Sequence, residues 1–235
     1  LEREMASRHG VPSGQVRLSV PLTFGEIVVM PALIEFQRRF PQVRLDVELS
    51  DRVVDFFEQP IDLAIRMTSE PPAAAIARKI GDDRRVLCAS PAYLRAHPRP
   101  RTARDLADHD CILFAGRRAA SEWGLLAAPG SSTIEAVQVR GRMRCNNTRS
   151  LHLAARAGLG IANLPLYLVR DDLQEGALVT VLDELVPGDR SIYLVYPAAR
   201  FMPTAVRELV TFLVDAFAAA PQTRAVPQTG SRARR

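Results

Sequence analysis

Cysteine, lysine and histidine are scarce in this 235-residue chain, and their scarcity excludes several kinds of site. The three cysteines, Cys88, Cys111 and Cys145, are odd in number, widely spaced and never arranged as CxxC. This pattern argues against a disulfide framework and against a zinc site, and lone thiols fit a reducing cytoplasm. The single lysine, Lys79, leaves little basis for Schiff-base chemistry. We therefore expect neither a structural disulfide nor a metal.

The motifs of common enzyme classes are missing as well. The sequence contains no G-x-S-x-G elbow, no P-loop, no HExxH and no cysteine beside a plausible base. Gly158-x-Gly160 looks like the start of a dinucleotide fingerprint, but it follows a predicted helix, and Asn163 stands where the third glycine belongs. The run Asp-His-Asp at 108–110 lacks further residues at metal-ligand spacing, so we expect a solvated loop there. We predict no enzymatic activity and no cofactor.

Long apolar runs and a basic body are also absent. No apolar run reaches the roughly 18 residues of a membrane span, and residues 1–10 are charged, unlike a signal peptide, so we expect a cytoplasmic protein with no membrane partner. The net charge is +5, but four arginines of the tail supply four of these charges, which leaves +1 for the rest. Because the body has no basic stripe with interleaved aromatics, this chain alone should bind DNA weakly. The tail, residues 221–235, reads as disordered and basic.

The chain, 47% hydrophobic and 24% charged, is long enough for one large domain or two lobes. Val16, Leu18 and Val20 predict a first strand, and the apolar spacing from residue 27 to 40 predicts a helix that ends before Pro41. Pro31 either opens this helix or kinks it, because proline lacks the amide donor of an interior helical position. The pattern is the first strand-turn-helix unit of a parallel α/β sheet.

Residues 41–68 give the clearest indication of a ligand cleft. Apolar side chains alternate from Val43 to Leu49, which is typical of a half-exposed edge strand, and a short helix follows. Leu63–Ile65 is apolar on both faces, as in a central strand of a covered sheet. Small molecules bind outside the carboxyl ends of such strands. The cleft candidates here are therefore Ser50, Asp51, Arg66, Met67 and Thr68.

The pattern starts again at Val86 and predicts a second lobe. Strands are expected at 86–89, 111–115, 134–139 and 160–164, with a Thr102-x-x-Asp105 cap and a helix that Gly158 ends in the left-handed conformation. An amphipathic helix from Pro203 carries six apolar residues on one stripe, whose burial contributes at most roughly 10 kcal/mol. We expect this helix to dock on the first lobe, so the chain crosses between the lobes near 87–90 and 187–192.

Two turns are candidates for ligand contacts because both precede helix starts, where unpaired amides favour anions. The first turn is Leu22-Thr23-Phe24, and the second is Asn146-Asn147-Thr148, which would face it from the other lobe. The alternative for Thr23, Asn147 and Thr148 is plain helix capping. Weaker candidates close two strands of the second lobe, and an Asn before a Leu-Pro turn often bonds its own backbone instead. These are Phe114, Ala115, Gly116, Asn163 and Leu164.

Three runs carry a resemblance to a known family. They are VRLSVPLTFGEIVVMPALIEFQRRFPQVRLDVELSDRVVDFFEQPIDLAIRM, CASPAYLRAHP with ARDLADHDCILF, and NNTRSLHLAARAGLGIANLP, and together they cover most of residues 15–218. In their order and spacing they look like the effector-binding domain of a LysR-type transcriptional regulator. The resemblance implies an α/β, two-lobed, periplasmic-binding-protein-like (type 2) fold, in which each lobe is a mixed, mostly parallel sheet flanked by helices.

The resemblance also implies an organisation and partners. Residues 1–14 would end a linker helix, 15–88 with 190–220 would form a discontinuous subdomain I, and 89–189 would form subdomain II. Because the chain begins at Leu1 rather than Met, we expect an upstream segment, and the family places a winged helix-turn-helix there. The family forms homodimers or tetramers, binds a small-molecule effector, and commonly contacts it through the hydroxyl residue that Thr23 matches.

Two other functions remain open from the sequence. A periplasmic solute-binding protein of an uptake system can share the two-lobed architecture, although lone thiols and the charged N-terminus argue against it. An enzyme on the same scaffold is the second rival. Asp51 indicates an amine or hydroxyl on the ligand, whereas the two helix starts indicate a carboxylate, and we expect a small organic acid.

Overall fold

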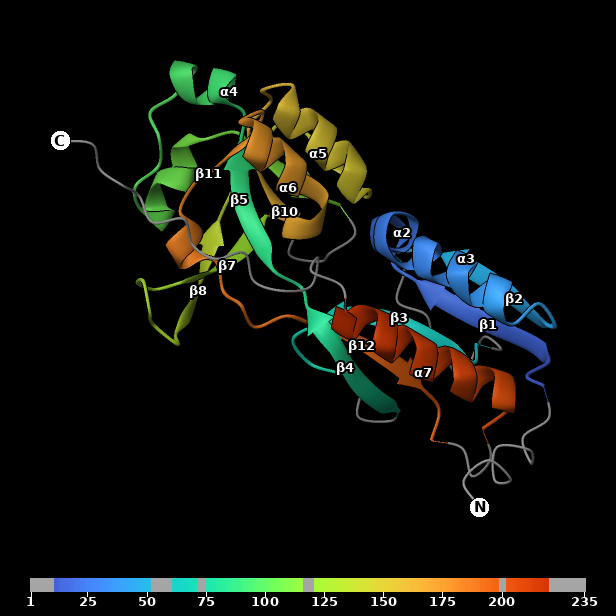
Figure 1. Ribbon diagram of the computed structural model, residues 1–235. Helices are drawn as coiled ribbons and strands as arrows, with labels where there is room; N and C mark the ends of the chain where they lie inside the picture. The colour runs from blue at the N-terminus through green and yellow to red at the C-terminus, as the bar shows by residue number, and fades with distance from the viewer. Residues whose placement is uncertain (1–10, 52–60, 72–74, 116–120, 199–201, 220–235) are drawn as a thin grey trace.

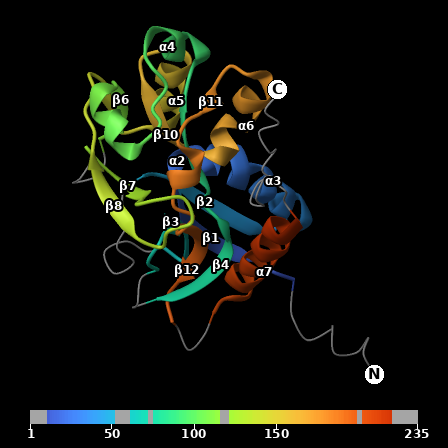
Figure 2. The same ribbon diagram turned by 90° about the vertical axis from the view of Figure 1, so that its left-hand side faces the viewer.

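Two lobes, each built on a five-stranded sheet, make up the computed structural model, which describes residues 11–51, 61–71, 75–115, 121–198 and 202–219 (Figures 1 and 2). The first sheet has the order β2 (Val43–Leu49), β1 (Gly14–Val20), β3 (Leu63–Thr68), β12 (Ser191–Tyr196) and β4 (Ile76–Asp82). The second has the order β11 (Val179–Thr180), β5 (Arg85–Ala89), β10 (Ile161–Pro165), β6 (Cys111–Phe114) and β9 (Arg144–Cys145). Both sheets are mixed, since β1 runs parallel to β2 and β3 while β12 is antiparallel to β3 and β4, and β10 is parallel to β6 but antiparallel to β5.

The first strand leads into one nearly continuous helical segment. It consists of α2 (Leu22–Phe24), a π-helical stretch η2 (Gly25–Val29) and α3 (Met30–Arg39). Pro31 lies in the first turn of α3, where its missing amide does least harm, and the wider π spacing precedes it. The segment ends before Pro41, as predicted.

The core of the first lobe matches the expected pattern. β2 is an edge strand, and Leu63, Ala64 and Ile65 of the central β3 are fully buried. The helix α7 (Thr204–Ala219) covers this sheet beside α3, with Leu213 among the buried side chains of the core, so its predicted docking on the first lobe is confirmed (Figure 1). The short helix expected between β2 and β3 falls on residues 52–60, outside the described part of the chain.

The second lobe carries α4 (Pro91–Ala96), η3 (Ala103–Asp108), α5 (Thr148–Arg156), α6 (Leu166–Glu175) and η4 (Asp183–Leu185), with a hairpin of β7 (Glu122–Leu126) and β8 (Ile134–Gln138). The predicted Thr102 to Asp105 cap forms, because the Thr102 amide donates to the Asp105 carboxylate at 3.0 Å. Gly158 adopts φ 81° just after α5, as predicted. Four elements were not predicted, namely β4, β7, α6 and η4.

The boundary between the lobes differs from the expected division. Residues 85–89 pair antiparallel with β10 and belong to the second sheet, so the first crossing lies at 83–84, not near 87–90, and a division after residue 88 splits β5. The expected linker helix is not present at 11–14, because 11–13 have no regular structure and β1 begins at Gly14. Residues 1–10 and the tail 221–235 lie outside the described residues.

Candidate functional site

A cleft of about 300 Å³ lies where the two lobes meet, at the carboxyl ends of β1, β2, β3, β6 and β10. A larger groove of about 1500 Å³ is lined only by residues between 84 and 185, so it does not join the lobes. Ligand sites in open α/β sheets lie at the carboxyl ends of strands, which favours the smaller cleft. It is lined by Pro21, Thr23, Phe24, Ser50, Asp51, Arg66, Met67, Asp83, Arg85, Ile112, Phe114, Glu122, Trp123, Thr148, Leu151, Asn163, Pro165, Tyr167 and Arg190.

Thr23 is the central residue on the first-lobe side of the cleft. It is the second residue of α2, only 2% exposed, and its Oγ1 has no hydrogen-bond partner among the described residues. Its hydroxyl does not cap the helix, whose N-cap residue is Pro21, and the Leu22 amide donates to Asp51 Oδ1 at 3.1 Å. A buried hydroxyl without a partner costs folding free energy, so such an atom at a cleft marks a position prepared for a ligand.

Two charged groups lie close to this turn. Asp51 follows β2 at the edge of the cleft, and partial burial raises the pKa of its carboxyl, while the hydrogen bond from the Leu22 amide lowers it. Arg66 donates to Ser19 Oγ at 3.2 Å and to the Ile65 carbonyl at 2.9 Å, which holds its guanidinium at the end of β1. Burial lowers the pKa of Arg66, and the charge of Glu48 opposes this shift. A carboxylate and a guanidinium therefore line the cleft together with Thr23.

The second-lobe turn at 146–148 is built differently. Asn147 is the N-cap of α5, and its Oδ1 accepts the Ser150 amide at 2.9 Å and the Ser150 hydroxyl at 3.2 Å. Asn146 and Asn147 do not line the cleft, whereas Thr148, the first residue of α5, does. Capping is thus the observed role of Asn147, and the lobe offers Thr148 and the start of α5 to the cleft instead.

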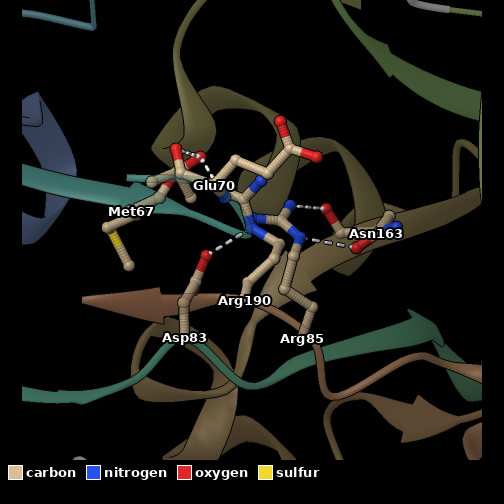
Figure 3. A network of polar contacts seen from close by, with 7 residues as sticks. Met67, Glu70, Asp83, Arg85, Asn163 and Arg190 are labelled. Atoms are coloured by element: carbon tan, nitrogen blue, oxygen red, sulfur yellow. Dashed lines mark hydrogen bonds and ion pairs between the residues drawn. The ribbon is translucent and has the colours of Figure 1, made fainter. Parts of the chain in front are cut away.

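A polar network at the crossing segments forms part of the cleft lining (Figure 3). Arg190, which precedes β12, donates to Asp83 Oδ2 at 2.7 Å and to the Met67 carbonyl at 2.6 Å. The Asp83 amide donates to the Arg190 carbonyl at 3.1 Å, so the two crossings are tied by backbone and side chain. In the figure, Arg85 extends beside Arg190, and its Nε donates to Asn163 Oδ1 at 2.8 Å.

Asp83 is unusual among these groups because one of its oxygens lacks a partner. The residue is 2% exposed, and Oδ1 has no hydrogen-bond partner in the part of the chain that the structure describes. Buried carboxylates are costly unless they are paired and hydrogen-bonded. Arg190 supplies the ion pair, and one acceptor position is left over at the cleft.

An aromatic contact also joins the two lobes. Tyr167 of α6 packs edge-on against Phe24 of α2, with ring centroids 5.2 Å apart. Burial raises the pKa of the Tyr167 hydroxyl, the charges of Asp83 and Asp51 raise it further, and the charge of Arg85 opposes them. Tyr167 therefore lies within electrostatic reach of the charged residues of both lobes.

Nine of the predicted site residues line the cleft: Thr23, Phe24, Ser50, Asp51, Arg66, Met67, Phe114, Thr148 and Asn163. Six do not line the cleft, and of these Asn147 caps a helix: Leu22, Thr68, Ala115, Asn146, Asn147 and Leu164. Gly116 lies outside the described residues. Lining a cleft does not test ligand contact, so these roles remain predictions.

Sequence reasoning missed ten lining residues. Tyr167 belongs to the unpredicted helix α6, and Asp83 and Arg190 lie in crossings that the sequence placed elsewhere or only approximately. A helical apolar spacing from Leu166 onward is the one signal that would have found α6. The ten residues are Pro21, Asp83, Arg85, Ile112, Glu122, Trp123, Leu151, Pro165, Tyr167 and Arg190.

Other candidates for chemistry do not form sites in the described residues. Burial raises the pKa values of the Cys88 and Cys111 thiols to about 12, so neither is a ready nucleophile. His109, expected in a solvated loop, is instead 5% exposed, with Nδ1 3.1 Å from the Tyr93 hydroxyl. No group of three metal-ligating side chains occurs within the described ranges. None of the described helices is both long and apolar enough to cross a bilayer.

Comparison with known proteins adds independent findings. A family model described as the LysR substrate binding domain matches residues 9–218. The probable HTH-type transcriptional regulator LtrA of Klebsiella pneumoniae is 34% identical over 212 residues, which cover 89% of this chain and 68% of that protein. The HTH-type transcriptional activator TtdR of Escherichia coli strain K12 is 31% identical over 202 residues, which cover 86% of this chain and 64% of that protein.

Solved structures agree with these relatives. The regulatory domain of AphB from Vibrio vulnificus has a TM-score of 0.74 and 28% identity, covering 86% of this chain and all of that one. CrgA from Neisseria meningitidis, a LysR-type transcriptional regulator, has a TM-score of 0.77 and 25% identity, and the match covers 92% of this chain and 72% of that one. The predicted two-lobed, periplasmic-binding-protein-like α/β fold is confirmed. The relatives are transcription regulators and not enzymes, which also confirms the prediction of no enzymatic activity.

Proposed function

Because the chain belongs to the LysR substrate-binding domain family, we propose that it senses a small organic acid in the cleft between its lobes. The chain spans about two thirds of the length of the curated relatives it matches. On this proposal the complete regulator also has an N-terminal winged helix-turn-helix that binds DNA. It assembles in the cytoplasm as a homodimer or tetramer, and residues before Asp83 and after Arg190 form one subdomain while those between them form the other.

The buried hydroxyl of Thr23, which has no partner among the described residues, is the observation that carries this proposal. It lines a cleft that also receives the start of α5 from the other lobe, where the helix dipole favours an anion. Arg66 and Arg85 add guanidinium groups to the same lining. A carboxylate in the cleft would accept a hydrogen bond from the Thr23 hydroxyl. It would also accept a charge-assisted hydrogen bond from a guanidinium group, which is the stronger kind of contact for an anion.

The signal depends on a difference in affinity between two arrangements of the lobes. A ligand that binds both arrangements equally shifts nothing, however tightly it binds. An acid held by Thr23 on one lobe and by α5 on the other makes both sets of contacts only when the lobes are close. Binding therefore favours the closed arrangement, and the crossings at Asp83 and Arg190 are where the chain transmits the change.

The direct test is Thr23→Val, which keeps the shape of the side chain and removes the hydroxyl. A thermal-shift screen of small organic acids on the 235-residue chain first identifies a binder, and calorimetry then measures its affinity for both proteins. We expect the substitution to weaken binding by about tenfold, the value of one hydrogen bond to a charged group.

Thr211→Val is the matched control, because Thr211 lies on the exposed face of α7 and bonds only the Arg207 carbonyl among the described contacts. It should bind the acid as the wild-type chain does. Equal affinities of the Thr23→Val protein and the wild type would refute the assignment of the cleft.

A further inference from the structure

We propose that the effector carries an ammonium group beside its carboxylate, as an amino acid does, and that Asp51, Asp83 and Tyr167 hold this ammonium. The inference rests on the proposed function, because it names the chemical class that the same cleft binds. It also resolves the two opposing indications in the sequence, since Asp51 favours an amine and the helix starts favour a carboxylate.

Asp83 leaves one acceptor open in the described lining of the cleft. Its Oδ2 is paired with Arg190 at 2.7 Å, but its Oδ1 has no partner among the described residues although Asp83 is 98% buried. A carboxylate oxygen can only accept, so a ligand group beside it has to donate. A second carboxylate at this position would be repelled, whereas a cationic donor would be bound most strongly.

Further acceptors line the same cleft. Asp51 and Asp83 both act electrostatically on the Tyr167 hydroxyl, although they come from the end of β2 and from the first crossing. Asp51, Asp83 and Tyr167 all line this cleft, so two carboxylates and a phenol oxygen belong to one lining. An ammonium has three donors and no acceptor, which suits three acceptors, whereas a hydroxyl has a single donor.

The charged side chains of the described lining balance one another. Three arginines, Arg66, Arg85 and Arg190, face three acids, Asp51, Asp83 and Glu122. A zwitterion keeps this balance and places each of its charges against the opposite one. Its carboxylate then lies toward the Thr23 hydroxyl and Arg66, which is fixed at the end of β1 beside the Thr23 turn.

The experiment compares acids that share one carbon skeleton and differ only at the α position. The twenty common L-amino acids are screened by thermal shift on the 235-residue chain, together with the α-hydroxy acid and the unsubstituted acid of the same skeletons, such as aspartate, malate and succinate. For a carbon skeleton whose amino acid binds, these three acids form a trio. Calorimetry should give the amino acid an affinity about tenfold or more above that of the hydroxy acid and that of the unsubstituted acid.

Asp51→Asn then tests the acceptors without disturbing the fold, because the amide oxygen of asparagine still accepts the Leu22 amide. The substitution should lower the affinity for the amino acid about tenfold and change the affinity for the unsubstituted acid by no more than about threefold. Asp46→Asn is the matched control, since Asp46 lies in the middle of β2, away from the cleft lining, with a side chain 66% exposed, and it should change neither affinity.

Two results would overturn the inference in distinguishable ways. If hydroxy or unsubstituted acids bind as tightly as the amino acid and still respond to Thr23→Val, the ammonium site is wrong while the acid sensor stands. If no acid of any trio binds, the proposed function fails, and this inference fails with it.

Discussion

At the start of α5, Asn147 accepts the Ser150 amide, whereas at the start of α2 the amide of Leu22 is accepted by Asp51 from another strand. Both turns carry small polar residues at or just inside a helix start, and both were expected to contact a ligand. In the second lobe the polar side chain is used to cap its own helix. In the first lobe the cap comes from a distant residue, so the Thr23 hydroxyl is left over in the cleft.

The reason for the difference is the position of each residue in its helix. An N-cap side chain has extended backbone and reaches the amides two or three residues ahead, and Asn147 has φ −126° and ψ 122°. Thr23 is already the second helical residue, after a proline at the N-cap that has no side-chain acceptor. A polar residue inside the first turn is therefore a better candidate for ligand contact than one at the cap itself.

The largest expected effect comes from removing the support of the first-lobe turn. Phe217 of α7 packs against Phe24, with ring centroids 5.9 Å apart, and Leu213 one turn earlier is fully buried. Leu213→Asp buries an unpaired charge and should lower the free energy of unfolding by about 4 kcal/mol or more. Urea titration measures this value. Thr211→Asp on the exposed face is the control, and equal midpoints for the two variants would show that α7 does not support the lobe.

The second prediction isolates the capping function of the second-lobe turn. Asn147→Ala removes the acceptor of the Ser150 amide and should cost about 1 kcal/mol of stability, the usual value of an N-cap. It should leave the affinity for the acid within about twofold, because Asn147 does not line the cleft. Asn146→Ala provides the comparison. A large loss of affinity in the Asn147→Ala protein would make the two turns equivalent after all.

The third prediction is the opposite behaviour for the first-lobe turn. Thr23→Val replaces a buried hydroxyl without a partner by a methyl group, so stability should stay unchanged or rise by less than about 1 kcal/mol. Chemical denaturation in the absence of acids measures this, beside the loss of affinity described above. A fall of more than about 1 kcal/mol would mean that the hydroxyl has a structural function.

The smallest expected effect is a pH dependence at the edge of the cleft. Partial burial raises the folded-state pKa of Asp51, so the folded protein binds this proton more tightly than the unfolded chain does. Stability therefore rises as the pH falls through the folded pKa toward the ordinary value of aspartate. Asp51→Asn lacks this gain, so its stability relative to the wild type should fall on acidification from about pH 7 to about pH 4. Parallel urea midpoints across that range would contradict the shift.

Most helices and strands follow from local pattern. Alternation predicted β2, uniform apolarity predicted β3, and the left-handed position of Gly158 predicted the end of α5, because each depends on neighbours in the chain. The polar strand ends also placed Ser50, Asp51 and Arg66 in the cleft. The predicted position of the first crossing was wrong, because strand pairing, not strand propensity, decides to which sheet residues 85–89 belong.

The sequence by itself determined the two-lobed α/β class, the ends of the strands that line the cleft and the resemblance to LysR-type regulators. Only the tertiary structure decided which polar atoms stay without partners there. The Asp83 and Arg190 contact spans 107 residues and the Leu22 and Asp51 contact spans 29, so neither leaves a local pattern. Hydrogen-bond satisfaction is settled by long-range packing, and the free acceptor and hydroxyl that define the cleft appear only when both lobes are in place.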